Sequence, residues 1–150
     1  MVLNILCPAY VVLERGKDVL ALCSGHEVIE WAEREAGPDD CYTLFVRFES
    51  PYGRGMVHIA GQVADDRKAG IVSQTQQVLA KIDALLKEAG SDCSRLIAVN
   101  VFLPHITDFD TMNSVYDAWI DLANPPARAC VEARLADPDL RVEMTAVALL

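Results

Sequence analysis

The sequence predicts a single domain in which helices pack on one β-sheet. The chain has 150 residues, which suits one domain and lets folding bury about 70% of the unfolded surface. A hydrophobic fraction of 52% is enough to form a core. The periodic segments follow the order strand, helix, strand, helix, strand, which is typical of crossover connections packed on one sheet.

The first part of the chain is expected to form an extension of unknown role, over residues 1–40, before a domain formed by residues 41–150. Apolar runs at residues 10–13 and 19–23 predict strands in this extension. Because such runs are not left in water, we expect them to pack on the core or to cover a subunit interface.

The next segments alternate between helical and extended patterns. An apolar stripe predicts a helix over residues 27–36, which the turn residues that follow would end. Residues 41–48 are rich in aromatic and β-branched side chains and predict a strand, as do residues 56–63. The clearest helical spacing covers residues 70–89, and Gly90 follows where a helix cap belongs.

A second strand and helix pair follows. Residues 96–103 predict a strand that is apolar on both faces and therefore central. Thr107, with Asp110 three residues later, resembles a capping box at the start of a helix that runs to about residue 121. This helix is expected to bury its large apolar side chains: Phe109, Met112, Val115, Tyr116, Trp119 and Ile120.

The stretch over residues 125–149 predicts two strands joined by a turn at residues 136–139. Alternation places Arg128 and Cys130 on one face of the first strand, and it places Glu143 on the polar face of the second. A guanidinium, a thiol and a carboxylate therefore interrupt an otherwise apolar stretch. The sequence leaves open whether these strands pair with each other, because one simple register would set like charges opposite each other.

Composition excludes several classes of function. The formal net charge of −9 repels phosphate backbones, so no nucleic-acid partner is expected. The five cysteines form no zinc pattern and are expected to be free thiols in a reducing cytoplasm. No phosphate-binding, dinucleotide or metalloprotease motif occurs, so we expect neither metal nor cofactor. The apolar N-terminus lacks a basic leader and is too short to span a bilayer, so we expect no membrane association.

Several short motifs occur in a fixed order over residues 48–150. They are Ala60-Gly61-Gln62, Gln74-Thr75, Asn113 with Tyr116, the run over residues 126–135, Val142-Glu143, and Ala146-Val147-Ala148. Together they resemble the Rid family, also called YjgF or L-PSP endoribonuclease. The resemblance implies a chorismate-mutase-like α+β fold, with a mixed β-sheet and two helices packed on one face. It also implies a homotrimer with ligand sites in the clefts between subunits.

The resemblance also implies a role for each candidate site residue. Arg128 matches the arginine that binds the substrate carboxylate, and its planar donors suit that group. Glu143 matches the acidic residue that positions the attacking water. Gly61 and Cys130 match positions that line the ligand site, and Asn113 matches a helix motif in which it would either bind the ligand or brace a loop. Without the resemblance, Arg128 and Glu143 would be interpreted as routine surface residues. No histidine is spaced to activate Cys130, so it is not expected to be a nucleophile.

One position departs from the family pattern, and two segments match the same part of it. Ala60 stands where the family usually has serine. Residues 19–25 also resemble the family strand that ends in Ser-Gly, but Gly61 is favoured because the helix with Gln74 follows at the expected spacing. Tyr52 is the candidate for an aromatic residue that lines the family site.

The leading hypothesis is a cofactor-free hydrolytic deaminase of reactive enamine and imine intermediates. Its substrate would be a small 2-imino or 2-aminoacrylate-type acid, and its products would be a 2-oxo acid and ammonia. The alternative is a non-catalytic or regulatory protein that binds a small ligand on the same scaffold. A third interpretation, an endoribonuclease, is disfavoured by the net charge of −9 and by the lack of a histidine pair.

Overall fold

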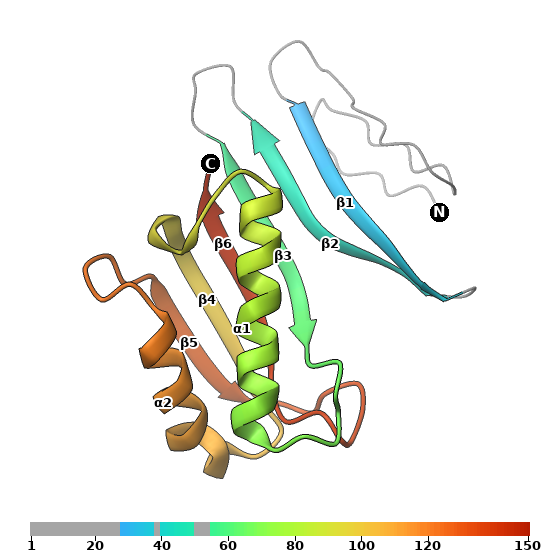
Figure 1. Cartoon of the computed structure of the whole chain (residues 1–150), viewed down its shortest axis with the longest axis vertical. Coiled ribbons are helices and arrows are strands. Elements are labelled where there is room, and N and C mark those ends of the chain that lie inside the picture. The colour runs from blue at the N-terminus through green and yellow to red at the C-terminus, as the bar shows by residue number, and fades with distance from the viewer. Residues whose placement is uncertain (1–27, 38–39, 50–54) are drawn as a thin grey trace.

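In the part of the chain that the structure describes, a mixed β-sheet of six strands carries two helices on one face (Figure 1). The strand order is β1-β2-β3-β6-β4-β5, and only the β4–β5 pair is parallel. The strands are β1 (Val28–Gly37), β2 (Asp40–Glu49), β3 (Met56–Val63), β4 (Leu96–Leu103), β5 (Ala127–Glu132) and β6 (Glu143–Leu149). The helices are α1 (Ile71–Glu88) and α2 (Phe109–Trp119). This arrangement confirms the expected α+β class and the covering of one face by two helices.

The computed structural model describes the backbone of residues 28–37 and 40–49, and both backbone and side chains of residues 55–150. The strands expected at residues 10–13 and 19–23 lie outside the described residues. So do the alternative match over residues 19–25 and the aromatic candidate Tyr52.

Residues 28–37 form strand β1, so the helix predicted over residues 27–36 is wrong. The strand pairs antiparallel with β2 along its length, from Val28 opposite Glu49 to Gly37 opposite Asp40. A short apolar run fits either a helix or a strand, and the pairing decides between them. Hydrogen bonds to β2 here replace the local bonds of a helix.

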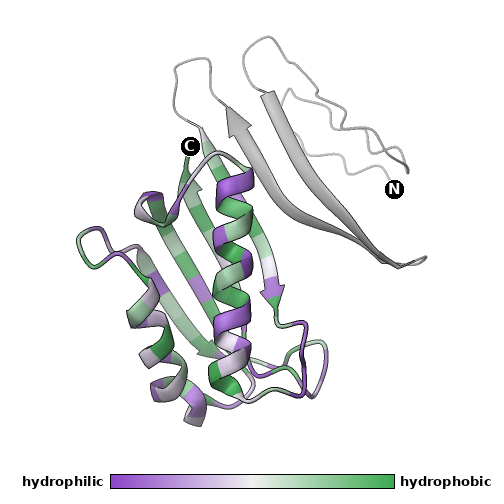
Figure 2. Ribbon diagram, in the orientation of Figure 1, coloured by the Kyte–Doolittle hydropathy of each residue, from purple (hydrophilic) through white to green (hydrophobic). Residues whose placement is uncertain are grey.

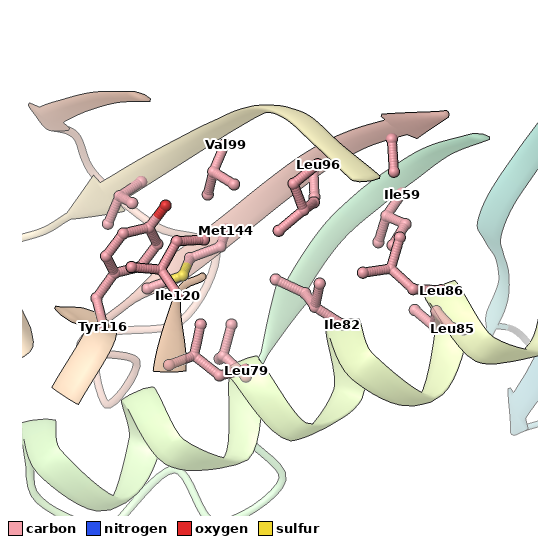
Figure 3. Packing of buried hydrophobic residues seen from close by; sticks show 14 of the residues in the cluster. Ile59, Leu79, Ile82, Leu85, Leu86, Leu96, Val99, Tyr116, Ile120 and Met144 are labelled. Atoms are coloured by element: carbon pink, nitrogen blue, oxygen red, sulfur yellow. The ribbon is translucent and has the colours of Figure 1, made fainter. Parts of the chain in front are cut away.

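Helix α1 follows its predicted pattern and provides one half of the core. Val78, Ile82 and Leu86 are fully buried, and Gly90 has a φ of 82° just beyond the helix. The Ser91 amide donates to the Leu86 carbonyl, which closes the last turn. Figure 3 shows Leu79, Ile82 and Leu86 pointing from α1 toward the strands.

Helix α2 begins at Phe109, and the predicted Thr107–Asp110 capping box does not form. Thr107 lies instead in a 3₁₀ turn, Ile106–Asp108. Asp108 occupies the N-cap position but makes no side-chain cap, because its carboxylate accepts three hydrogen bonds from the Arg141 guanidinium at 2.6–2.9 Å. The buried face of the helix includes Met112 and Tyr116 as predicted.

The two faces of the sheet differ in burial. On the helix-covered face, Val99 and Val101 of β4 pack beside Met144 and Ala146 of β6. Figure 2 shows apolar residues dominating strands β3 to β6, and polar and apolar residues alternating along the helices. Alternate residues of β6, beginning with Glu143, lie on the helix-free face, where Glu143, Thr145 and Val147 are partly buried and Leu149 is exposed. Within the described residues, neither helix has the length and hydropathy that crossing a bilayer requires.

Strands β5 and β6 do not form a hairpin, because β4 lies between them. Strand β4 pairs parallel with β5 and antiparallel with β6. The pairing of like charges that a hairpin would bring is therefore avoided. Strand β5 is left at the edge of the sheet, next to α2 (Figure 1).

Candidate active site

Arg128 projects from edge strand β5 toward helix α2. It lies beside Val99 of β4, whose buried side chain faces the helices, so Arg128 shares that face. Its Nη1 donates a hydrogen bond to Oδ1 of Asn113 at 2.6 Å. Its guanidinium carbon lies 4.6 Å from the ring centroid of Tyr116 and 5.9 Å from that of Phe109. The arginine is therefore held by one amide and two aromatic rings.

Helix geometry explains why α2 can hold the arginine. Phe109, Asn113 and Tyr116 recur at intervals of four and three residues, which places them on one side of a helix. The Tyr116 side chain is buried as expected, and its ring also forms the platform under Arg128. Burial raises the pKa of the Tyr116 phenol, so the ring stays neutral beneath the cation.

Asn113 makes a second contact that the sequence did not indicate. Its Nδ2 donates to Oδ2 of Asp117 at 2.7 Å, one turn further along α2. The amide thus joins an acceptor on the helix to the guanidinium of Arg128. The spacing of four residues between Asn113 and Asp117 is the signal that could have found this pair.

Cys130 lies on the same face of β5 as Arg128 and is partly buried. Burial raises the pKa of the Cys130 thiol, and the nearby Arg128 charge only partly offsets this effect. The thiol is therefore protonated at neutral pH and is a poor nucleophile.

Glu143 lies on the opposite face of the sheet. It pairs with Phe102 of β4 and with Val63 of β3 at the start of β6. Gly61 stands beside it, because a register shift between Ile59 and Gln62 bends β3 at this point. A Cβ atom at Gly61 would overlap Oε1 of Glu143, so only glycine leaves room for this carboxylate.

The structure therefore divides the predicted residues into two groups. Arg128 and Cys130 of β5 lie on the helix-covered face beside Asn113 of α2, whereas Gly61 and Glu143 meet on the helix-free face. Side chains on opposite faces of a sheet diverge, so one chain does not bring Arg128 and Glu143 to the same small molecule. Within residues 55–150, the Glu143 carboxylate has neither a hydrogen bond nor an ion pair.

Two hollows of the described region lie away from both groups. One, of about 540 Å³, is an open groove between α1 and α2 that includes Leu79 and Trp119 in its lining. The other, of about 470 Å³, is lined by polar residues that include Lys68 and Arg141. Neither contains a predicted site residue. In the part of the chain that the structure describes, no three His, Cys, Asp or Glu side chains converge as metal ligands.

Known proteins resemble this chain in both sequence and fold. The sequence profile of the family described as endoribonuclease L-PSP matches residues 47–150. A RutC family protein of Haemophilus ducreyi is 40% identical over 96 residues, which are 64% of this chain and 82% of that protein. The 2-iminobutanoate/2-iminopropanoate deaminase of Salmonella typhimurium is 32% identical over 111 residues, 66% of this chain and 87% of the enzyme.

Solved structures agree with these sequence matches. A member of the YjgF protein family from Neisseria meningitidis superposes with a TM-score of 0.67 at 35% identity, covering 80% of this chain and 94% of that one. A Yersinia pestis protein described as belonging to the Rid family gives a TM-score of 0.66 at 26% identity, over 77% of this chain and 90% of that one. The match to the family profile spans the sheet from β3 onward and both helices, including every predicted site residue. The chain therefore belongs to the L-PSP endoribonuclease family, also called YjgF or Rid.

Proposed function

We propose that this protein hydrolyses small 2-imino acids, or the enamines in equilibrium with them, to 2-oxo acids and ammonia. The observation that carries the proposal is the exposed guanidinium of Arg128, fixed by Asn113 and by the Tyr116 ring. The Salmonella relative named as an imine deaminase supports the same reaction class.

Arg128 is suited to bind the substrate carboxylate. A guanidinium has five N–H donors in one plane. Among the described residues, its only hydrogen bond is the one that Nη1 donates to Asn113. The Nε and Nη2 groups can therefore donate a pair of bonds to a carboxylate, which matches the fork geometry of that group.

Glu143 is suited to position and deprotonate water. The water oxygen would add to the C=N carbon while its proton passes to the carboxylate. Proton return to nitrogen and collapse of the tetrahedral adduct would break the C–N bond, leaving the C=O bond and free ammonia. One water is consumed for each ammonia released, so the reaction needs no oxidant or reductant. Such imines already hydrolyse in water, so positioning and local charge would be enough.

The complete site would form between subunits of a homotrimer. One subunit would contribute Arg128, Asn113 and Cys130, and its neighbour would contribute Gly61 and Glu143. The divergence of these groups on opposite sheet faces supports this arrangement. Exposed apolar side chains on the strands, such as Val131 at 47%, supply surface that association would bury.

A non-catalytic ligand-binding role is the alternative. Ala60 supplies no hydroxyl where the family usually has serine, so one potential hydroxyl contact is missing. An endoribonuclease role has less support. The Asp117 carboxylate stands beside Asn113 on the Arg128 side, and the net charge is −9; both would repel a phosphate backbone.

The test pairs turnover with binding. Ammonia release from freshly generated 2-aminoacrylate and binding of pyruvate would be measured for the wild type, Arg128→Ala, Arg128→Lys and Glu143→Gln. Removing Arg128 should weaken binding by about 30-fold to several-thousand-fold, and lysine should not fully restore it. Glu143→Gln should lower kcat while pyruvate still binds, because the carboxylate contacts the water.

Arg134→Ala is the matched control, because Arg134 is an exposed arginine just beyond β5 with no contact to the candidate site in the described region. Full turnover in Arg128→Ala would end the assignment of this site. A wild type that binds pyruvate without raising ammonia release above background would establish the binding role instead.

A further inference from the structure

Two successive hydrogen bonds connect Arg128 to a carboxylate on α2. Arg128 donates to Asn113 at 2.6 Å, and Asn113 donates to Asp117 at 2.7 Å. We propose that Asp117 is a positioning residue, which fixes the Asn113 amide and thereby aims the Arg128 guanidinium at its ligand. The proposal rests on the proposed function, since it assumes that Arg128 binds a carboxylate.

The chemistry of the three groups allows only one arrangement. An ionised carboxylate only accepts hydrogen bonds and a guanidinium only donates them. The Asn113 amide must therefore turn its nitrogen to Asp117 and its oxygen to Arg128. Asn113 is only partly buried, so its side chain would rotate among several conformers if one end were released. Asp117 is thus the anchor that keeps the amide oxygen in place.

The aromatic rings cannot do this alone. Tyr116 lies 4.6 Å from the guanidinium carbon and restricts movement of Arg128 toward or away from the ring. A cation over a ring face can still slide parallel to that face. The hydrogen bond to Asn113 fixes the remaining direction and leaves Nε and Nη2 without a hydrogen-bond partner among the described residues. Positioning therefore needs both the platform and the amide.

Charge alone predicts the opposite effect of removing Asp117. A carboxylate near the site repels an anionic ligand, so its loss should by charge alone strengthen the binding of pyruvate. Loss of positioning should weaken binding instead. The two explanations differ in sign, which makes the substitution decisive.

The experiment measures pyruvate affinity and steady-state kinetics for Asp117→Ala, Asp117→Asn, Asn113→Ala and the double variant Asn113→Ala/Asp117→Ala. Asp117→Ala should weaken pyruvate binding roughly 3- to 10-fold, the range for loss of one supporting hydrogen bond. KM should rise by a similar factor with little change in kcat, because the carboxylate is bound alike in ground and transition states. Asp117→Asn loses the charge but keeps an acceptor oxygen, so it should recover most of the affinity.

The double variant tests the route of the effect. If Asp117 acts only through Asn113, then Asp117→Ala should change nothing further once Asn113 is alanine. Glu88→Ala is the control for loss of one negative charge from a helix, because Glu88 is an exposed residue of α1 with no hydrogen bond or ion pair among the described residues. Its pyruvate affinity should match the wild type. Thermal melting of each variant reports whether the fold is intact.

Two results would overturn the positioning role. Wild-type or tighter pyruvate binding by a folded Asp117→Ala would leave only the effect of charge. Additive losses in the double variant would show that Asp117 acts by another route.

If Arg128→Ala also bound pyruvate normally, the proposed function would fail with it. Weak binding by Arg128→Ala together with normal binding by Asp117→Ala would reject the positioning role alone. Should Asp117→Ala fail to fold, Asp117→Ser would give the same comparison, because its short hydroxyl does not reach Asn113.

Discussion

Gly61 and Glu143 show how one residue without a side chain shapes a candidate site. The register shift in β3 brings the Gly61 backbone against the Glu143 carboxylate, where a Cβ atom would overlap Oε1. The family resemblance suggested that Gly61 gives a ligand room to approach. In the structure, the missing side chain of Gly61 leaves the space that the Glu143 carboxylate occupies.

Substitution of Gly61 tests this placement. In Gly61→Ala the carboxylate must move, and because it ends a flexible side chain, the free energy of unfolding should change by less than about 1 kcal/mol. If Glu143 positions water, kcat should fall by about 10- to 100-fold, as expected for a displacement near 1 Å. Gly70→Ala is the control, since a Cβ there has no neighbour within 4 Å. Unchanged kcat in a folded Gly61→Ala protein would contradict the role of Glu143.

The candidate site residues could be read from the sequence, but their grouping could not. Alternation within β5 correctly places Arg128 and Cys130 on one face. The side on which Glu143 stands relative to them depends on β4, which lies between the two strands. The spacing of Asn113 and Asp117 could have indicated their contact within α2, but only the structure shows that the same amide also accepts from Arg128. The local sequence pattern shows which side chains of one strand share a face. Which face a residue on another strand occupies depends on how the strands pair, and the local pattern does not show this.

Among the elements, the start of α1 organises two loops through one buried side chain. Gln74 is fully buried and its Nε2 donates to the carbonyls of Arg67, Ala69 and Asp139 at 2.8–2.9 Å. Its Oε1 accepts from the Arg141 amide at 2.8 Å. The Gln74 side chain thereby hydrogen-bonds both the loop after β3 and the loop before β6, next to the strands that carry Gly61 and Glu143.

Gln74→Leu should therefore destabilise the fold. The substitution keeps a similar volume but leaves one backbone N–H and several carbonyls without their partner. We expect the free energy of unfolding in urea to fall by about 2–4 kcal/mol. Gln76→Leu, at an exposed position two residues along α1, should change it by less than about 0.5 kcal/mol. Equal stability of the two variants would show that water can replace the Gln74 contacts.

Most elements of the family-like region follow from periodicity, and the failures have physical causes. The strand predicted at residues 96–103 and the helix predicted at residues 70–89 recur almost unchanged as β4 and α1. The helix predicted at residues 27–36 failed because pairing with β2 outweighs local preference. The cap predicted at Thr107 failed because residues 106–108 form a 3₁₀ turn and the helix begins only at Phe109.

At the scale of the whole molecule, helices cover one face of the sheet, and no described helix covers the other. Val131 on edge strand β5 is 47% exposed, and its alternation with Cys130 places it on the helix-free side. Met56 and Leu149, which pair with each other across β3 and β6, are also exposed. Isolated apolar residues are ordinary at a surface, but several on strands of one sheet favour association.

Light scattering at micromolar concentration should give a mass of three chains. Val131→Lys should lower that mass, because burying an ammonium group at an interface is costly, and it should lower imine turnover in parallel. Leu122→Lys is the matched control, since Leu122 is 76% exposed in the loop after α2. A wild-type mass of one chain would remove the site between subunits.

The central position of β6 also has a consequence for the order in which the chain can fold. Strands β1, β2 and β3 precede β4 and β5, yet β3 and β4 are neighbours only through β6. During synthesis, β3 and β4 cannot be joined in this sheet until residues 143–149 have been made and inserted between them. Until then the inner edges of β3 and β4 present unpaired backbone groups, which are templates for wrong pairing with other nascent chains. Insertion of β6 pairs both of these edges at once and so removes them as templates.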